Sequence, residues 1–217
     1  MAVAVVTSAA NVETAGTSRS VSITVNSGEQ LICVAAIPAN GTGSSFQFNG
    51  VGMTTVASVP AKSGGGSLYV LYLESPSTGT NSFTWTASAG GEFGISYAIT
   101  ISGATTPNTD DEQTGNGANP IDLTATSTTN NGIYIITGAA TRNGGGSDQT
   151  IGSATVLQRS ESLGGSAEAI VGYGTYSAIG SVAAQYANGG TNSACAIEVL
   201  VAGANTAVSK LGLLGVG

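Results

Sequence analysis

The feature that most constrains this chain is an internal duplication, in which strand-like segments of the first half recur in the same order in the second half. Residues 21–25 and 121–125 both alternate apolar and polar side chains, which is the pattern of a half-buried β-strand. The other matched pairs are residues 31–37 with 133–139, 51–56 with 151–156, 68–72 with 169–173, and 95–101 with 193–199. Because the matched segments are always about 100 residues apart, the sequence predicts two copies of one strand pattern.

The segments between Gly-, Asn-, Ser- and Pro-rich turns read as short strands, and no capped segment shows a sustained helical period. Strands are expected at residues 20–25, 30–37, 45–49, 53–58, 68–74, 82–87, 94–102, 120–126, 132–140, 149–157, 167–176, 180–187 and 194–202. Several short strands at regular spacing predict an all-β, antiparallel sandwich or barrel of about 12 strands with almost no helix.

Residues 103–119, rich in Thr, Asn, Gly and Pro, form the boundary between the halves. They could join two domains, but each half has a modest aromatic content and Trp85 is the only tryptophan. We therefore expect one sandwich over residues 1–202, in which pseudo-repeats 15–103 and 119–202 complete each other.

The last 15 or so residues, 203–217, lie beyond the last expected strand and end in an apolar, Gly-rich run. An apolar tail exposed to water is a liability, so it is expected to dock on the sandwich or on a neighbouring molecule. The candidate docking residues are Leu211, Leu213, Leu214 and Val216.

Charge is scarce in this chain: charged residues make up 8% of the sequence, and the net charge is −7. The five basic residues are scattered, whereas phosphate-backbone binding needs clustered Lys and Arg, so neither a nucleic acid nor an anionic membrane is an expected partner. The start lacks a basic segment followed by a long apolar run, which predicts synthesis in a cytoplasm without a signal peptide. A polar, uncharged surface suits a protein that packs against copies of itself or against a larger assembly.

The two cysteines, Cys33 and Cys195, each lie inside a strand-like run. Both are expected to be buried free thiols that act as small hydrophobic side chains. A disulfide between them is geometrically possible, but the expected folding in a cytoplasm argues against it.

Catalytic and cofactor chemistry finds little support in these residues. Histidine is absent, which removes the commonest general base near neutral pH and the Ser-His-Asp triad. The Gly-rich run at residues 64–67 precedes a strand and lacks the lysine of a phosphate-binding loop. We therefore expect no catalytic residue, no cofactor and no enzymatic activity.

Two weak ligand sites remain open. The acidic cluster Asp110, Asp111 and Glu112, with Asp122 nearby, could fold round a calcium ion or could be a solvated charge run in a linker. Exposed aromatic side chains could stack on a sugar ring, and the candidates are Tyr69, Tyr176 and Phe93. Tyr72 and Tyr173 occupy equivalent repeat positions, which indicates a shared core or interface role instead.

The order of four segments, residues 17–34, 48–54, 71–86 and 194–201, resembles the Gly/Ser/Thr-rich, jelly-roll-like β-sandwich domains of phage structural proteins and bacterial surface proteins. The resemblance covers roughly residues 15–202 and has no short invariant motif. It implies a jelly-roll-like sandwich of the kind found in tail fibres, capsid decorations and adhesins, and it carries over no catalytic residue.

From this resemblance we expect a non-enzymatic bacteriophage virion protein, either a capsid decoration (cement) protein or a fibre component. The alternative is a carbohydrate-binding or host-receptor-binding module of a tail fibre or surface adhesin. The implied partners are further copies of the chain as a homotrimer, the major capsid protein or another virion protein, and, for the alternative, glycans. The implied location is the virion.

Overall fold

In the computed structural model the described residues are 3–13, 16–37, 41–59, 67–88, 93–104, 106–115, 121–127, 132–141, 150–161, 167–176, 178–186 and 191–199. They form sixteen strands and contain no helix. The first half holds β1 (Ala4–Glu13), β2 (Ser18–Val25), β3 (Glu29–Ile37), β4 (Gly43–Phe48), β5 (Val51–Gly52), β6 (Thr54–Val59), β7 (Ser67–Leu73), β8 (Gly79–Ala87) and β9 (Gly94–Ser102). The second half holds β10 (Asn108–Gly115), β11 (Ile121–Ser127), β12 (Ile133–Thr141), β13 (Thr155–Glu161), β14 (Ala167–Thr175), β15 (Gly180–Tyr186) and β16 (Thr191–Val199).

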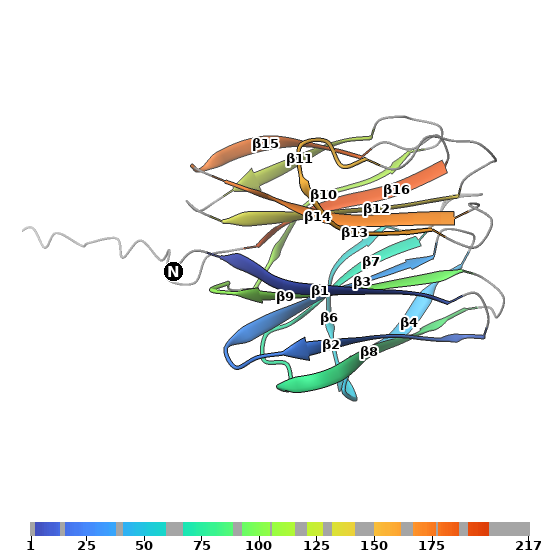
Figure 1. The fold of residues 1–217 in the computed structure, drawn as a ribbon. Coiled ribbons are helices and arrows are strands. Elements are labelled where there is room, and N and C mark those ends of the chain that lie inside the picture. Colours follow the sequence, from blue (N-terminus) through green and yellow to red (C-terminus); the bar gives the residue numbers. More distant parts are fainter. Residues whose placement is uncertain are drawn as a thin grey trace, which may run out of the picture.

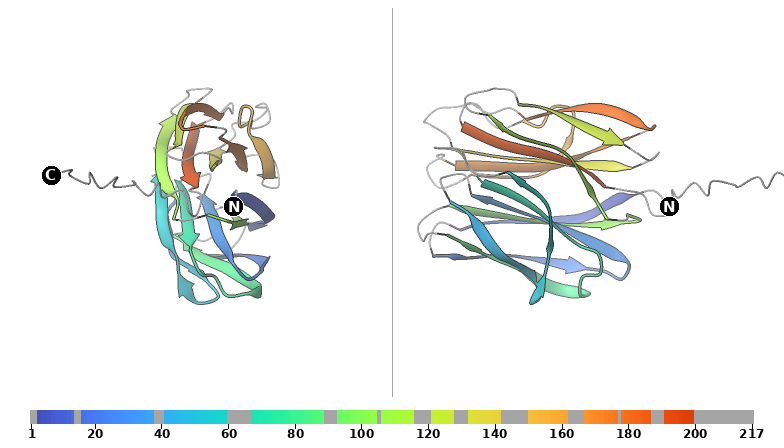
Figure 2. Two further views of the ribbon diagram at one scale, coloured as in Figure 1. Left: turned by 90° about the vertical axis from the view of Figure 1, so that its left-hand side faces the viewer. Right: turned by 180° about the vertical axis from the view of Figure 1, so that it is seen from behind.

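These strands form four antiparallel sheets that lie on one another as four layers (Figures 1 and 2). The two inner layers are five-stranded sheets with the orders β1-β9-β3-β7-β6 and β10-β16-β12-β14-β13. The outer layers are the sheet β2-β8-β4-β5 below and the pair β11-β15 above, as seen in Figure 1. Each sheet draws its strands from one half of the chain only.

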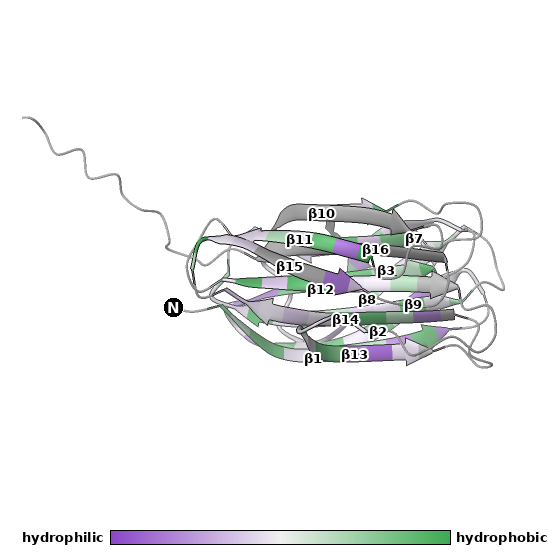
Figure 3. Ribbon diagram, turned by 90° about the horizontal axis from the view of Figure 1, so that it is seen from above, coloured by the Kyte–Doolittle hydropathy of each residue, from purple (hydrophilic) through white to green (hydrophobic). Residues whose placement is uncertain are grey.

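The burial pattern of each strand explains its layer. Strands β2 and β11 bury every second residue, because one face of an outer sheet meets water, and hydrophobic and hydrophilic residues alternate along β11 in Figure 3. Strands β3 and β9 are buried almost continuously, because both faces of an inner sheet are covered. A continuous apolar run bounded by turn residues is the sequence pattern of such a strand.

The two inner sheets have the same topology, which supports the duplication predicted from sequence. Replacing β1, β9, β3, β7 and β6 by β10, β16, β12, β14 and β13 converts one strand order into the other, and β2-β8 likewise becomes β11-β15. A β-bulge interrupts the pairing of every edge strand of the inner sheets, namely β1, β6, β10 and β13. Bulges twist an edge and hinder its pairing with another chain.

Three apolar clusters hold the layers together. One lies between β2-β8-β4-β5 and its inner sheet and contains Phe83 and Trp85, and one lies between β11-β15 and the other inner sheet and contains Tyr186. The third, which we call the central core, lies between the two inner sheets and includes Ile32 and Ile135. The halves are therefore joined by a core of their own.

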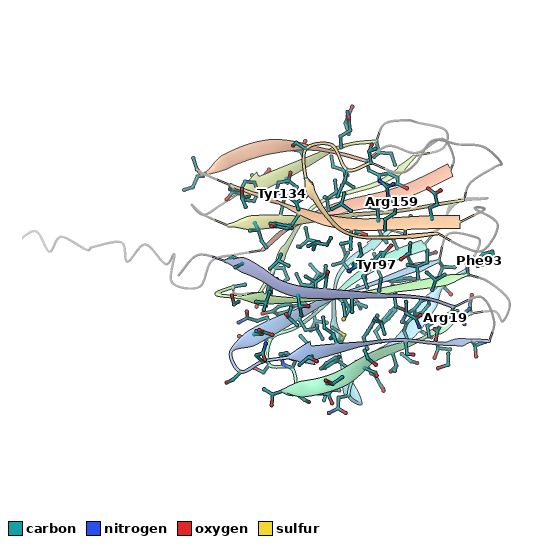
Figure 4. All side chains as sticks on the ribbon, viewed as in Figure 1. Arg19, Phe93, Tyr97, Tyr134 and Arg159 are labelled. Carbon is teal, nitrogen blue, oxygen red and sulfur yellow. The ribbon has the colours of Figure 1, made fainter. Side chains whose placement is uncertain are left out.

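The central core has an approximate two-fold arrangement. Strand β1 lies beside β13, and β10 lies beside β6. Because β10 is the counterpart of β1 and β13 is the counterpart of β6, exchanging the two halves converts one contact into the other. Tyr97, at the junction of the inner sheets in Figure 4, donates a buried hydrogen bond of 2.6 Å from its hydroxyl to the Ala169 carbonyl. The halves meet as two subunits of an isologous dimer would, but within one chain.

The strand pairing also corrects the repeat alignment by one residue at β3 and β12. The sequence match set Leu31 against Ile133, yet Leu31 faces its outer layer whereas Ile133 faces the central core. The pairs Leu31–Leu73 and Tyr134–Gly174 make Tyr134 the structural counterpart of Leu31. A one-residue slip exchanges the two faces of a strand, and continuously buried strands give no alternation that would fix it from sequence.

Other expectations have mixed outcomes. The all-β, antiparallel fold is confirmed, but the structure has sixteen strands where about 12 were expected, and four sheets where one sandwich was expected. Edge strands β1 and β10 were not predicted, and β10 lies within the expected linker. Strand β13 begins at Thr155, later than the expected start at residue 149.

Within the described ranges, no helix qualifies as a membrane span.

Cys33 is a free thiol that is fully buried in the first half's outer cluster, as expected from sequence. The side chain of Cys195 lies outside the described residues. Burial raises the pKa of the Cys33 thiol well above its ordinary value, so the native protein holds it as an unreactive thiol. We expect Cys33 to be silent towards a thiol reagent in the native state and to react after unfolding without reductant. Mass spectrometry of the labelled peptide checks this; labelling in the folded protein would contradict it.

Candidate functional site

The residues singled out as sugar-stacking candidates do not form one site. The Tyr69 hydroxyl accepts a hydrogen bond from the Gly43 amide at 3.2 Å, and its ring lies 5.0 Å from that of Phe46. Tyr176 is 3% exposed, with its ring 5.4 Å from that of Tyr134. The partly buried Tyr69 ring and the buried Tyr176 ring each pack against another aromatic side chain. Phe93 lies just before β9 and is half-buried (Figure 4).

The acidic cluster takes a different form from the expected loop. Asp110, Asp111 and Glu112 belong to the paired strand β10, and their side chains lie outside those described. Asp122 is exposed on β11 and accepts a hydrogen bond of 2.8 Å from the Gln185 amide. In the described part of the chain, no group of three or more acidic, His or Cys side chains is placed to hold a metal ion. The tail residues Leu211, Leu213, Leu214 and Val216 also lie outside the described residues.

The predicted equivalence of Tyr72 and Tyr173 is confirmed. Both belong to the central core, Tyr72 fully buried and Tyr173 partly buried. Tyr72 pairs with Ile32 and Thr54, and Tyr173 pairs with Ile135 and Thr155, so their neighbours correspond as well.

The outer face of sheet β2-β8-β4-β5 carries a ladder of paired hydroxyls. Along β2 and β8 the outward residues are Ser18, Ser20, Ser22, Thr24, Thr80, Ser82, Thr84 and Thr86. The Ser22 and Ser82 hydroxyls lie 2.8 Å apart, as do those of Thr24 and Thr80. Such cross-strand hydroxyl pairs stabilise a sheet and leave an uncharged, polar surface. We call this surface the hydroxyl face.

The second half repeats this design on its own outer layer. The Thr126 and Ser181 hydroxyls lie 3.3 Å apart across β11 and β15, and Asp122 pairs with Gln185 further along. The two ends of the four-layer stack therefore present similar polar sheets, which the scarcity of charged residues in the sequence already suggested.

A second feature is a cleft at one corner of the central core, near the ends of β3 and β7. It has a volume of about 350 Å³ and is lined by Thr54, Tyr72, Leu73, Glu74, Ser75 and Thr106. A neighbouring depression of about 310 Å³ shares Glu74 and Ser75 and includes Glu29 and Gln30. We call the two together the corner cleft. The sequence did not indicate it, because its lining residues are far apart along the chain and meet only in the folded structure.

The corner cleft contains two buried polar atoms that make no hydrogen bond of normal geometry, the Tyr72 hydroxyl and the Gln30 side-chain carbonyl. Tyr72 is 3% exposed. Burial, with the nearby Glu74 carboxylate, raises the pKa of Tyr72 to about 12, although the Thr106 side chain partly opposes the shift. The Tyr72 hydroxyl therefore stays protonated near neutral pH and can donate a hydrogen bond.

Glu29, at the rim of the cleft, has a structural role in the turn before β3. Its carboxylate accepts hydrogen bonds from the Asn26 amide nitrogen and the Asn26 side chain, each 2.9 Å long. Burial raises the pKa of Glu29, but the hydrogen bonds to the carboxylate outweigh this and leave the pKa below its ordinary value of 4.5. The ionised form is the one that holds the turn.

A pH dependence follows from the lowered pKa of Glu29. The stabilisation is fully present above the unfolded-state pKa and is lost as pH falls through the lower folded-state pKa. We expect Glu29→Gln to lower the free energy of unfolding by about 1 kcal/mol at pH 7. The difference from the parent chain should shrink once pH falls below about 4.5, and denaturant unfolding at pH 7 and pH 3 measures it. A difference that is constant with pH would contradict the role of the charge.

Comparisons of the chain with protein-family models, with curated proteins and with solved structures found no match.

Proposed function

We propose that this chain is a non-enzymatic structural component of a bacteriophage virion, a capsid decoration (cement) or fibre protein. The observation that carries the proposal is the hydroxyl face, with its counterpart on the second half. Polar sheets with few charged side chains and with hydroxyls that are already paired can lie against copies of the chain or against a capsid with little burial of unpaired charge.

The strand order of the first half supports the finer proposal of a jelly-roll-like arrangement. In the first half, β1, β3, β7 and β9 belong to the inner sheet and β2, β4, β5 and β8 belong to the outer sheet, in the orders β1-β9-β3-β7 and β2-β8-β4-β5. Two packed sheets of four strands with this interleaved order are the arrangement of the jelly rolls of viral capsid and lectin domains. Strand β6 then extends the inner sheet.

The proposed partners are other copies of the chain, as a homotrimer, and the major capsid protein or another virion protein. The bulged edges of the inner sheets hinder open-ended strand addition, which favours closed association through faces. Synthesis in the host cytoplasm and a final location in the virion go with this role.

The proposal is tested by quantifying the chain in purified particles by mass spectrometry, with its oligomeric state measured by light scattering at tens of micromolar. We expect a fixed copy number per particle, with hundreds indicating decoration and a few dozen or fewer a fibre. Light scattering is expected to give a trimer. Absence from particles would refute the virion role, and a monomer would refute the trimer.

The second candidate function is recognition of a carbohydrate, and the corner cleft favours it. The cleft combines a buried hydroxyl without a good partner with carboxylate and amide oxygens. A glycan array with the purified chain separates this candidate from a purely structural role.

A further inference from the structure

We propose that the corner cleft binds a neutral sugar, with the Tyr72 hydroxyl donating a hydrogen bond to one sugar oxygen and Glu74 and Gln30 accepting from adjacent sugar hydroxyls. This deepens the second candidate function, and it names the site and the class of ligand. Its failure would leave the virion role standing, because that role is measured on particles.

The position of the polar atoms follows from the sheet register. Tyr72 pairs with Ile32, and Leu73 pairs with Leu31, which is the last pair of β7 with β3. Gln30 pairs with Ile101 on β9, and Ile101 and Tyr72 both belong to the central core, so Gln30 and Tyr72 lie on the face of the inner sheet towards the second half. Glu74 follows directly after β7 and lines the same depression as Gln30.

The buried Tyr72 hydroxyl is the observation that points to a ligand. A buried polar group without a partner costs about 1–3 kcal/mol, and native structures keep few of them. Tyr72 carries such a hydroxyl at the wall of a cleft large enough for a small ligand, and Gln30 carries a second unpaired atom in the adjoining depression. A ligand that donates to Gln30 and accepts from Tyr72 would satisfy both.

The charge of the cleft selects the ligand. No Lys or Arg is found among the described residues that line either depression, whereas Glu74 lines both depressions and Glu29 lines one of them. An anionic sugar would meet these carboxylates without a compensating cation. A neutral sugar offers adjacent hydroxyls that donate to the carboxylate and amide oxygens and accept from the tyrosine.

The duplicated half supplies a matched control. Tyr173 stands at the equivalent position, but Ile133 and Thr175 stand where the first half has Gln30 and Glu74. Tyr173 therefore has the same ring and hydroxyl without the two acceptors. The Tyr72→Phe and Tyr173→Phe variants each lose one hydroxyl, and only the first loses it from the proposed site.

The test uses the full chain on an array of neutral, sialylated and sulfated glycans, followed by calorimetric titration of the best ligand. We expect a neutral glycan to bind, with affinity about tenfold or more weaker in Tyr72→Phe and in Glu74→Gln. Tyr173→Phe should bind as the parent does. The midpoint of thermal unfolding of Tyr72→Phe without ligand should not fall, because no hydrogen bond of good geometry is lost.

Several results would overturn the proposal. They are binding to no glycan, preference for anionic glycans, or equal weakening by Tyr72→Phe and Tyr173→Phe. Titration with calcium alone forms a separate arm. Calcium binding that Glu74→Gln abolishes, without glycan binding, would assign the cleft to a cation instead.

Discussion

Replacing Gly174 with leucine is expected to lower the free energy of unfolding by about 3 kcal/mol, because there is no room for a side chain there. A Cβ atom at Gly174 would overlap the ring of Tyr134 on the neighbouring strand. The ring is buried in the second half's outer cluster beside Tyr176 and cannot move aside. Urea unfolding followed by circular dichroism measures the loss.

The reason for expecting so large an effect lies in the repeat. Where the first half pairs Leu31 with Leu73, the second half pairs Tyr134 with Gly174. One large and one small residue thus fill the space of two leucines. Gly138 and Gly172 make room in the same way for Tyr186 and Ile151.

The compensating variant tests this explanation. Tyr134→Leu alone should cost about 2 kcal/mol through lost volume and aromatic contact. The double variant, Tyr134→Leu with Gly174→Leu, restores the leucine pair of the first half. Its free energy of unfolding should be about 2 kcal/mol higher than the sum of the two single effects predicts. As a control, Gly52→Leu on β5 meets open space and should change stability little. Strict additivity of the two single effects would refute the compensation.

The strands with one solvent-exposed face were predicted well from the sequence. Alternation located β2 and β11 closely, since their outward residues are Ser, Thr and Asp. The duplication survived as shared topology, and the equivalence of Tyr72 and Tyr173 correctly indicated an interface position. Each of these conclusions rests on local pattern, which strands express in their own residues.

Other features depend on what lies next to a strand. Strand β10 contains no large apolar residue, because it is an edge strand held by backbone pairing to β16, so no hydrophobic pattern marks it. The inner strands are covered on both faces, so their sequences show no alternation. Without alternation, the sequence gives neither the correct alignment of β3 with its counterpart β12 nor the stacking of the two inner sheets. Tyr69 and Tyr176 were expected at the surface for the same reason, since alternation does not show that a second layer covers a strand's outer face.

The stacking of the two inner sheets leads to the second large effect, which compares neighbouring residues of β12. Ile135 and Ile136 are both fully buried, but Ile135 faces the central core and Ile136 faces the second half's own outer cluster. Truncation of either to alanine should cost about 2–5 kcal/mol through lost burial and the cavity left behind. The two variants should differ in which strands lose protection.

Native-state hydrogen exchange distinguishes them, because it reports local opening strand by strand. Ile135→Ala removes packing that both halves share, so we expect faster exchange in β3 and β9 of the first half as well as in β12 and β14. Ile136→Ala should speed exchange in the second half and leave β3 and β9 at parent rates, because its cluster contains no first-half residue among those described. If Ile135→Ala also left the first half unchanged, the central core would be a contact between independent units. Faster exchange in both halves would instead establish it as the element that makes the duplicated chain one cooperative structure.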